Sequence, residues 1–205
     1  KPLKLDCGQT ISSFPLAYET YGKLNDKKDN AILVFHALTG DQFASGVNPI
    51  TNKEGWWNYL IGPGKAIDTK KYFVICANVI GGCMGSYGPS NINPKTNKNF
   101  GTEFPVITIN DMVNAQYHLL EFFKIKKLFS VLGGSMGGMQ VLQFISNFPD
   151  KSETAIPIAC THSHSAQNIA LNELGRQSIM ADHNWANGFY DDNNKSPTKG
   201  LAVAR

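Results

Sequence analysis

Residues 131–140 read Val-Leu-Gly-Gly-Ser-Met-Gly-Gly-Met-Gln and are the most informative part of this chain. Gly133 to Gly137 matches G-x-S-x-G, the pattern of a nucleophile elbow, in which a serine occupies a sharp turn between a strand and a helix. The flanking residues fit that setting, because Leu128 to Leu132 is a short apolar run and Met136 to about Asn147 has helix-compatible spacing. We therefore predict that Ser135 is a nucleophile; the alternative is a glycine-rich turn that holds a serine by chance.

The turn at Ser135 should be strained, so its neighbours must be small, and glycines at 133, 134, 137 and 138 meet that need. Two backbone N–H groups are candidates for an oxyanion hole. Met136 lies at a helix N-terminus, where N–H groups face an incoming anion. The second donor should come from the loop after an early strand, and we assign it to Leu38 in His36-Ala-Leu-Thr-Gly40. We interpret His36 as a hydrogen-bonded structural histidine and not as a base.

Four apolar runs predict strands that are buried on both faces, as in a parallel sheet. They are Ala31 to Leu38, Tyr72 to Ile80, Leu128 to Leu132 and Ala155 to Cys160. A helix is predicted over 109–123, with Thr108 and Asp111 as a capping box. Alternating strands and helices indicate α/β architecture.

The two ends of the chain differ in pattern from this alternating part. Residues 1–24 alternate well enough for an antiparallel hairpin at one sheet edge. Residues 165–190 are polar with helical spacing, which suggests a cap over the sheet. Residues Pro197 to Arg205 resemble the start of a helix. We therefore expect a core over 1–164 that lacks its later strands, and the beginning of a helical lid over 165–205.

Composition narrows the function classes. The chain has 205 residues, 42% of them hydrophobic, with a net charge of +3. Its basic residues are scattered and no apolar run approaches a membrane span, so we expect neither a nucleic-acid nor a membrane partner. The four cysteines lack C-x-x-C spacing, which favours a reducing compartment, and we expect the cytoplasm.

Two other motifs give weaker predictions. Residues 81–88 are glycine-rich and follow a strand, but they lack G-x-G-x-x-G spacing and a P-loop lysine. We interpret them as a loop at the mouth of the active site, with a plain structural loop as the alternative. His162 and His164 are two residues apart, but no third ligand is evident, so we expect no metal site.

The chain resembles the homoserine O-acetyltransferase family of the α/β-hydrolase superfamily. The matching segments span nearly the whole chain in the family's order, so their combination is far more specific than the elbow alone. They are residues 36–41 (HALTGD), 62–68 (GPGKAID), 78–83 (NVIGGC), 133–140 (GGSMGGMQ), 165–169 (SAQNI) and 172–177 (NELGRQ). The resemblance implies an α/β-hydrolase fold, a mostly parallel sheet flanked by helices.

The resemblance also implies an activity and residue roles. The family transfers an acetyl group from acetyl-CoA to the hydroxyl of L-homoserine in methionine biosynthesis. Ser135 matches the nucleophile that becomes acylated, and Arg176 matches an arginine that holds the substrate carboxylate. A guanidinium suits that role because it binds a carboxylate bidentately; the alternative for Arg176 is an ordinary exposed arginine. Acetyl-CoA would be a co-substrate, with no tightly bound cofactor, and the full-length enzyme is expected to be a homodimer.

One departure from the family pattern concerns the catalytic triad. The family's aspartate and histidine follow the lid, and neither is matched here. His162 and His164 come too early for the order serine, acid, histidine, and Asp182 and His183 are adjacent. We therefore expect this chain to be an inactive N-terminal fragment of a longer enzyme. The sequence leaves open a succinyl donor, a serine acceptor, a serine esterase or hydrolase, and a non-enzymatic binding protein.

Overall fold

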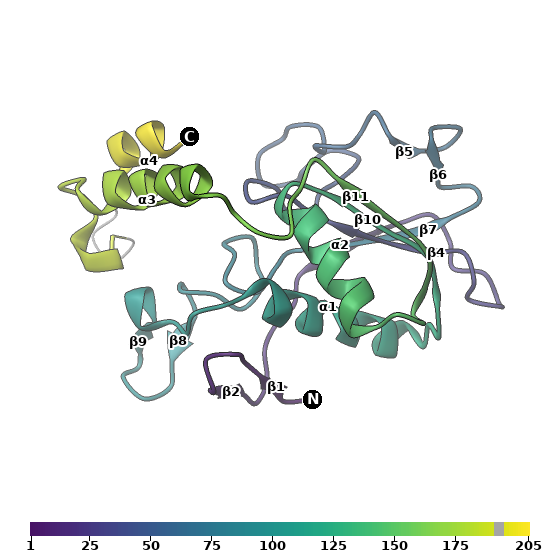
Figure 1. The fold of residues 1–205 in the computed structure, drawn as a ribbon, viewed down its shortest axis with the longest axis horizontal. Helices are drawn as coiled ribbons and strands as arrows, with labels where there is room; N and C mark the ends of the chain where they lie inside the picture. Colours follow the sequence, from purple (N-terminus) through teal and green to yellow (C-terminus); the bar gives the residue numbers. More distant parts are fainter. Residues whose placement is uncertain (191–194) are drawn as a thin grey trace. The chain divides into compact units, whose positions relative to one another are not determined.

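The computed structural model describes residues 1–190 and 195–205 (Figure 1). The chain divides into two compact units. The first comprises Lys1–Tyr87 and Pro105–Thr161, and the second comprises Gly88–Phe104 and His162–Arg205.

A five-stranded sheet forms the centre of the first unit, in the order β11-β10-β4-β7-β3. These strands are β3 (Tyr18–Tyr21), β4 (Ala31–Phe35), β7 (Phe73–Ala77), β10 (Leu128–Gly134) and β11 (Ser152–Ile158). Four of them are parallel, and β3 pairs antiparallel with β7. The predicted mostly parallel sheet is therefore confirmed.

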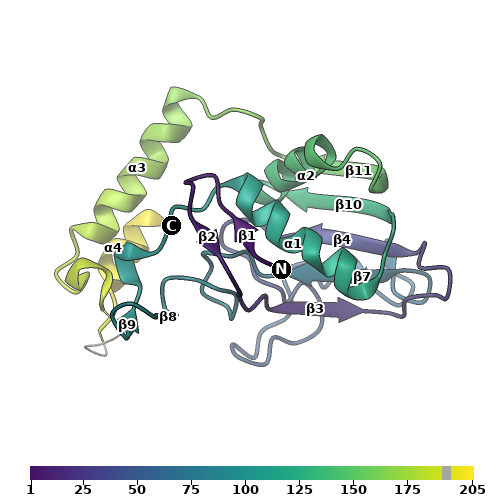
Figure 2. The same cartoon turned by 90° about the horizontal axis from the view of Figure 1, so that it is seen from below.

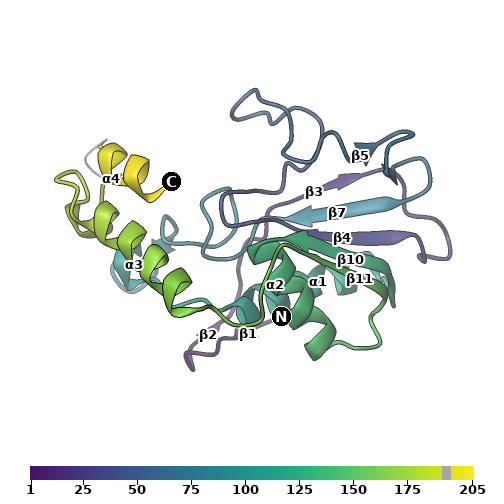
Figure 3. The same cartoon turned by 45° about the horizontal axis from the view of Figure 1, so that its top comes forward.

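The two faces of this sheet are covered differently (Figure 3). On one face, α1 (Ile109–Phe123) and α2 (Met136–Asn147) pack against alternate residues of the central strands, which include Leu33 and Ile75. On the other face, the segment between β4 and β7, with the short strands β5 (Ile61–Gly62) and β6 (Ile67–Asp68), covers Val34 and Cys76. Burial on both faces explains why all five residues of β4 and of β7 are buried.

The expected burial of the fourth strand is wrong. β11 forms a parallel strand beside β10, but most of its residues are exposed, with Ile156 at 49% and Ile158 at 39%. The physical reason is its position, since β11 is the last strand of the sheet order and has one neighbour among the described residues. An apolar run indicates a strand, but it does not reveal how many neighbours that strand has.

The N-terminal hairpin is only partly as expected. β1 (Leu3–Lys4) and β2 (Thr10–Ile11) pair antiparallel as a separate two-stranded sheet, seen beside α1 in Figure 2. The apolar side chains of this hairpin pack with Ile80 and Ala115. The edge of the main sheet is formed instead by β3, which follows the hairpin.

The capping box of α1 is confirmed. The Thr108 side chain accepts a hydrogen bond from the N–H of Asp111, and the Asp111 carboxylate accepts one from the N–H of Thr108. Asp111 is fully buried and also accepts a hydrogen bond from the N–H of Asp6. The cap therefore ties the start of α1 to the N-terminal segment.

The second unit contains two helices that pack on each other, α3 (Ala166–Met180) and α4 (Thr198–Ala204). Pro197 occupies the N-cap of α4, so a helix begins there as expected. The unit also contains β8 (Ile92–Asn93), β9 (Lys98–Asn99), η1 (Gly101–Glu103) and η2 (Ala186–Gly188). No helix in the described part of the chain is long and apolar enough to cross a membrane.

Candidate active site

Ser135 occupies the turn between β10 and α2, as the motif predicts. Its backbone has φ 56° and ψ −120°, a conformation that L-residues rarely adopt. The N–H of Ser135 donates to the carbonyl oxygen of Ile158 at 3.0 Å, which anchors the turn to β11. The residue is exposed. Strand, strained turn and helix together present the hydroxyl to solvent at the carboxyl end of the sheet.

Three of the four elbow glycines are required because neighbouring atoms approach too closely for a Cβ: backbone atoms at Gly133 and Gly137, and the Cys160 side chain at Gly138. A Cβ at Gly137 would lie 2.1 Å from the carbonyl oxygen of Phe35, and one at Gly133 would lie 2.7 Å from the same oxygen. A Cβ at Gly138 would lie 2.7 Å from the sulfur of Cys160. Gly134 differs, because nothing lies within 4 Å of a Cβ built there. The expectation that this fourth glycine is needed for space is therefore wrong.

The loop after β4 lies beside the elbow. β4 and β10 are parallel neighbours with Phe35 opposite Gly133, so both chains leave the sheet at the same end. The contact of Gly137 with Phe35 then brings the first turn of α2 against the end of β4. Leu38 follows in this loop, with a side chain that is 71% exposed.

The N–H groups of Leu38 and Met136 have no hydrogen-bond acceptor among residues 1–190 and 195–205. Met136 is the first residue of α2, where backbone N–H groups have no partner within the helix. Two free donors on adjacent segments near an exposed serine are what an oxyanion hole requires. Their assignment to that role stays a prediction.

His36 is a buried residue, only 1% exposed, with both ring nitrogens in hydrogen bonds. Its Nδ1 lies 2.7 Å from the carbonyl oxygen of Ala37, so Nδ1 must carry a proton. Its Nε2 accepts from the N–H of Val79 at 3.1 Å and is therefore unprotonated. Burial lowers the pKa of His36 below its ordinary value, which agrees with this neutral ring. Since neither nitrogen is free, the interpretation of His36 as structural and not as a base agrees with the geometry.

Sequence reasoning gave no role to the buried polar residues that surround this loop. Asn78 is 2% exposed; its side-chain oxygen accepts from the N–H of Met84, and its backbone carbonyl accepts from the hydroxyl of Ser86 at 2.6 Å. Gln140 is fully buried, accepts from Gln116 at 2.7 Å and donates to the carbonyl oxygen of His36 at 3.4 Å. The sequence offered one signal for these residues, an amide side chain within an otherwise apolar segment. Such a side chain indicates a buried hydrogen bond, because a buried polar group needs a partner.

Arg176 lies on α3 in the second unit, with a side chain that is 60% exposed. Its guanidinium forms an ion pair with Glu173 one turn earlier, with Nε at 2.9 Å and Nη2 at 2.5 Å from the same carboxylate oxygen. Hydrogen bonds from Gln177 and Arg176 lower the pKa of Glu173. An exposed ion pair of this kind contributes little stability, so the guanidinium can exchange partners at low cost. The role that the family resemblance implies for Arg176, holding the substrate carboxylate, stays a prediction.

A triad partner for Ser135 is not apparent among the described residues, since its hydroxyl has no hydrogen bond to a histidine there. His162 and His164 are exposed residues of the second unit. Asp182 accepts hydrogen bonds from the N–H groups of Asn184 and Gly200, so it organises the start of α4. No group of three or more metal-ligating side chains occurs in the part of the chain that the structure describes.

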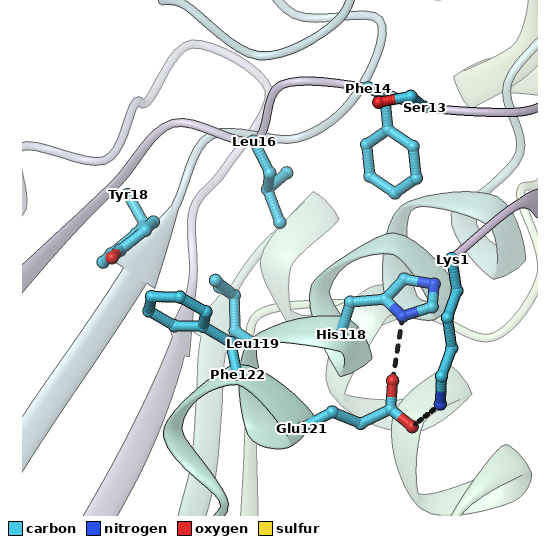
Figure 4. Close-up of a pocket in the computed structure, with 9 residues that line it drawn as sticks. All are labelled: Lys1, Ser13, Phe14, Leu16, Tyr18, His118, Leu119, Glu121 and Phe122. Atoms are coloured by element: carbon cyan, nitrogen blue, oxygen red, sulfur yellow. Dashed lines mark hydrogen bonds and ion pairs between the residues drawn. The ribbon is translucent and has the colours of Figure 1, made fainter.

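The first unit also has a surface cavity of about 390 Å³ between α1 and the segment before β3 (Figure 4). Apolar side chains such as Leu16 and Phe122 form much of its wall. At one end, Glu121 accepts from Lys1 at 2.5 Å and contacts His118 at 3.1 Å. None of the predicted site residues lines this cavity, so we assign it no part in the chemistry.

Comparison with known proteins agrees with the geometry. A family model described as alpha/beta hydrolase fold matches residues 30–200. The chain is 78% identical to a homoserine O-acetyltransferase of Pelagibacter ubique and 60% identical to one of Mesorhizobium japonicum, over all 205 residues in both cases. It covers 55% and 53% of those proteins, so it spans about half the length of the curated relatives it matches.

Two kinds of solved structure resemble it almost equally. Esterase E22 aligns with a TM-score of 0.89 at 37% identity, over 99% of this chain and 57% of that one. A homoserine O-acetyltransferase from Bacillus anthracis aligns with a TM-score of 0.90 at 33% identity, over 100% of this chain and 56% of that one. The chain therefore belongs to the α/β-hydrolase fold family, and its resemblance to homoserine O-acetyltransferases holds along its whole length.

Proposed function

We propose that this chain is part of an acyltransferase that moves an acetyl group from acetyl-CoA to the hydroxyl of L-homoserine through an acyl-Ser135 intermediate. The observation that carries the proposal is a complete elbow at Ser135 in a chain that is 78% identical to a homoserine O-acetyltransferase. Acetyl-CoA acts as a co-substrate, and no tightly bound cofactor is needed.

The first half-reaction forms the acyl-enzyme. A histidine outside residues 1–205 takes the proton of the Ser135 hydroxyl, and the oxygen attacks the thioester carbonyl. The N–H groups of Leu38 and Met136 hold the oxyanion, a contribution of roughly 2.7–4 kcal/mol for each donor in comparable sites. The carbon–sulfur bond breaks, and CoA leaves as a thiol with the proton that the histidine held.

The second half-reaction transfers the acyl group. The homoserine hydroxyl loses its proton to the same histidine and attacks the acyl carbonyl, and the proton then returns to Ser135. Arg176 holds the homoserine carboxylate, and its guanidinium leaves Glu173 to do so. Water must be kept from the acyl-serine during this step, and the lid predicted from the sequence would serve that purpose.

A serine esterase is the second candidate, and the similarity to esterase E22 favours it. The two activities share the elbow, the oxyanion hole and the acyl-serine. They differ in what accepts the acyl group, because water replaces homoserine in an esterase. Residues 172–177, which include Arg176, favour the transferase, because homoserine carries a carboxylate for the guanidinium to hold and a simple ester does not.

The test incubates the full-length protein with acetyl-CoA, with and without L-homoserine. A transferase releases CoA in a burst equal to the enzyme concentration and turns over only when homoserine is present. Mass spectrometry should find the acetyl adduct on Ser135, and Ser135→Ala should keep the fold while losing both burst and turnover. Steady CoA release without homoserine would identify a hydrolase, and an adduct on another residue would refute the assignment of Ser135.

The same assay identifies the acyl donor and the acyl acceptor. Succinyl-CoA in place of acetyl-CoA tests the donor, and L-serine in place of L-homoserine tests the acceptor. We propose a homodimer for the full-length enzyme, which sedimentation analysis would test. The described cysteines are free thiols, and we propose that the protein works in the cytoplasm, where thiols stay reduced.

A further inference from the structure

The turn that carries Leu38 is held through the carbonyl oxygen of Ala37. This oxygen accepts a hydrogen bond from the N–H of Gly40 at 2.9 Å, which closes a turn over Ala37 to Gly40. It accepts a second one from Nδ1 of His36 at 2.7 Å. The oxygen of Ala37 and the N–H of Leu38 belong to one planar trans peptide and point in opposite directions. Fixing the carbonyl oxygen therefore fixes the direction of the Leu38 N–H.

The His36 ring is itself held by neighbouring segments of the first unit. The N–H of Val79, in the loop after β7, donates to Nε2 at 3.1 Å, and the Asn78 side chain lies 3.4 Å from the same atom. On the backbone side, Gln140 of α2 donates to the carbonyl oxygen of His36 at 3.4 Å. His36 thus connects the loop after β7 and the elbow helix to the turn that carries Leu38.

We propose that His36 is a positioning residue for the oxyanion hole, and that its Nδ1–H aims the Leu38 N–H at the oxyanion formed on attack by Ser135. The inference rests on the proposed acyl-serine chemistry but not on the identity of the acyl acceptor. His36 does not transfer a proton in this role, because both its ring nitrogens are already in hydrogen bonds.

Two substitutions separate positioning from simple packing. In His36→Asn the amide nitrogen can occupy the place of Nδ1 and still donate to Ala37, whereas in His36→Gln it reaches the place of Nε2 instead. The substrate is p-nitrophenyl acetate with full-length protein, so the result holds whether the natural acceptor is homoserine or water. Val113→Ala, a fully buried change on α1, is the control for general loss of stability.

We expect His36→Gln to lower kcat by about 10²–10³, the effect of losing one oxyanion donor, with little change in KM. We expect His36→Asn to retain clearly more activity than His36→Gln. Val113→Ala should keep kcat at temperatures where it is folded. The proposal is overturned if His36→Gln keeps as much activity as His36→Asn, or if both lose no more than Val113→Ala.

A measurement on the protein without substitutions tests the proposal independently of whether the variants fold. Nitrogen NMR of labelled histidine reports the tautomer of each ring. We expect His36 to be neutral with the proton on Nδ1 at pH 7. A proton on Nε2 alone would leave no donor for Ala37 and would overturn the proposal. The full-length protein could fail to transfer acetyl to homoserine while His36 carries its proton on Nδ1 and His36→Asn retains more activity than His36→Gln. That result would refute only the proposed acceptor.

Discussion

Gly137→Ala should disrupt the elbow by forcing α2 away from β4. The added Cβ would lie 2.1 Å from the Phe35 carbonyl oxygen and 2.8 Å from its carbonyl carbon. Since carbon and oxygen normally approach to no less than about 3.3 Å, the helix would have to move by roughly 1.2 Å. The Cβ is fixed rigidly to its own backbone and its neighbour is a backbone carbonyl, so no side-chain rotation can relieve the contact.

Overpacking of a core costs typically 1–3 kcal/mol, and a contact between a Cβ and a backbone carbonyl that cannot rotate away belongs at or above the upper end. We expect Gly137→Ala to lower the free energy of unfolding by about 3 kcal/mol or more, or Tm by about 6–12 °C for a domain of this size. Displacing the first turn of α2 also moves the Met136 N–H, so labelling of Ser135 by a fluorophosphonate in the full-length protein should slow as well.

Gly134→Ala is the matched control, because a Cβ there meets nothing within 4 Å. The same chemical change three residues earlier, at the last residue of β10, should alter the free energy of unfolding by less than about 1 kcal/mol. Thermal unfolding followed by circular dichroism measures both variants, with labelling of Ser135 in parallel. Equal Tm values for the two variants would refute the argument from backbone contact.

Three further predictions concern the second unit, the pH dependence and the helix cap. Arg176→Lys should weaken transfer to homoserine by roughly 1.5–3 kcal/mol and leave the CoA burst unchanged; a slower burst with normal homoserine dependence would contradict the carboxylate role. Because burial lowers the pKa of His36 from its ordinary 6.5, its ring is protonated in the unfolded chain at a higher pH than in the folded chain. As the pH falls from the unfolded to the folded pKa of His36, the free energy of unfolding should therefore decrease by up to about 1.4 kcal/mol per pH unit. His36→Asn should remove this part of the pH dependence, as measured by urea titrations at several pH values. Thr108→Ala removes the acceptor for the Asp111 N–H and should cost about 0.5–2 kcal/mol without changing kcat; an unchanged urea midpoint would show that the cap is dispensable.

The local structure around Ser135 was predictable from the sequence alone. An apolar run, a glycine-rich turn and a helical pattern occur consecutively there, and each is a short-range signal. Hence the strand, the strained serine and α2 follow the motif closely. The capping box of α1 was predictable for the same reason, because its two partners are three residues apart. The family resemblance was also readable, since it rests on residue identity along the chain.

Features that depend on neighbours distant in sequence could not be predicted and became visible only in the folded chain. The apolar run of β11 gave no sign that the strand has one neighbour among the described residues, and β3 displaced the expected hairpin from the sheet edge. The requirement for Gly137 comes from Phe35, and Gly134 meets no comparable neighbour. His36 acquires its tautomer from Ala37 and Val79, which contact the ring from two different loops. Hydrogen-bond geometry between separate segments decides such roles, and a linear sequence does not contain it.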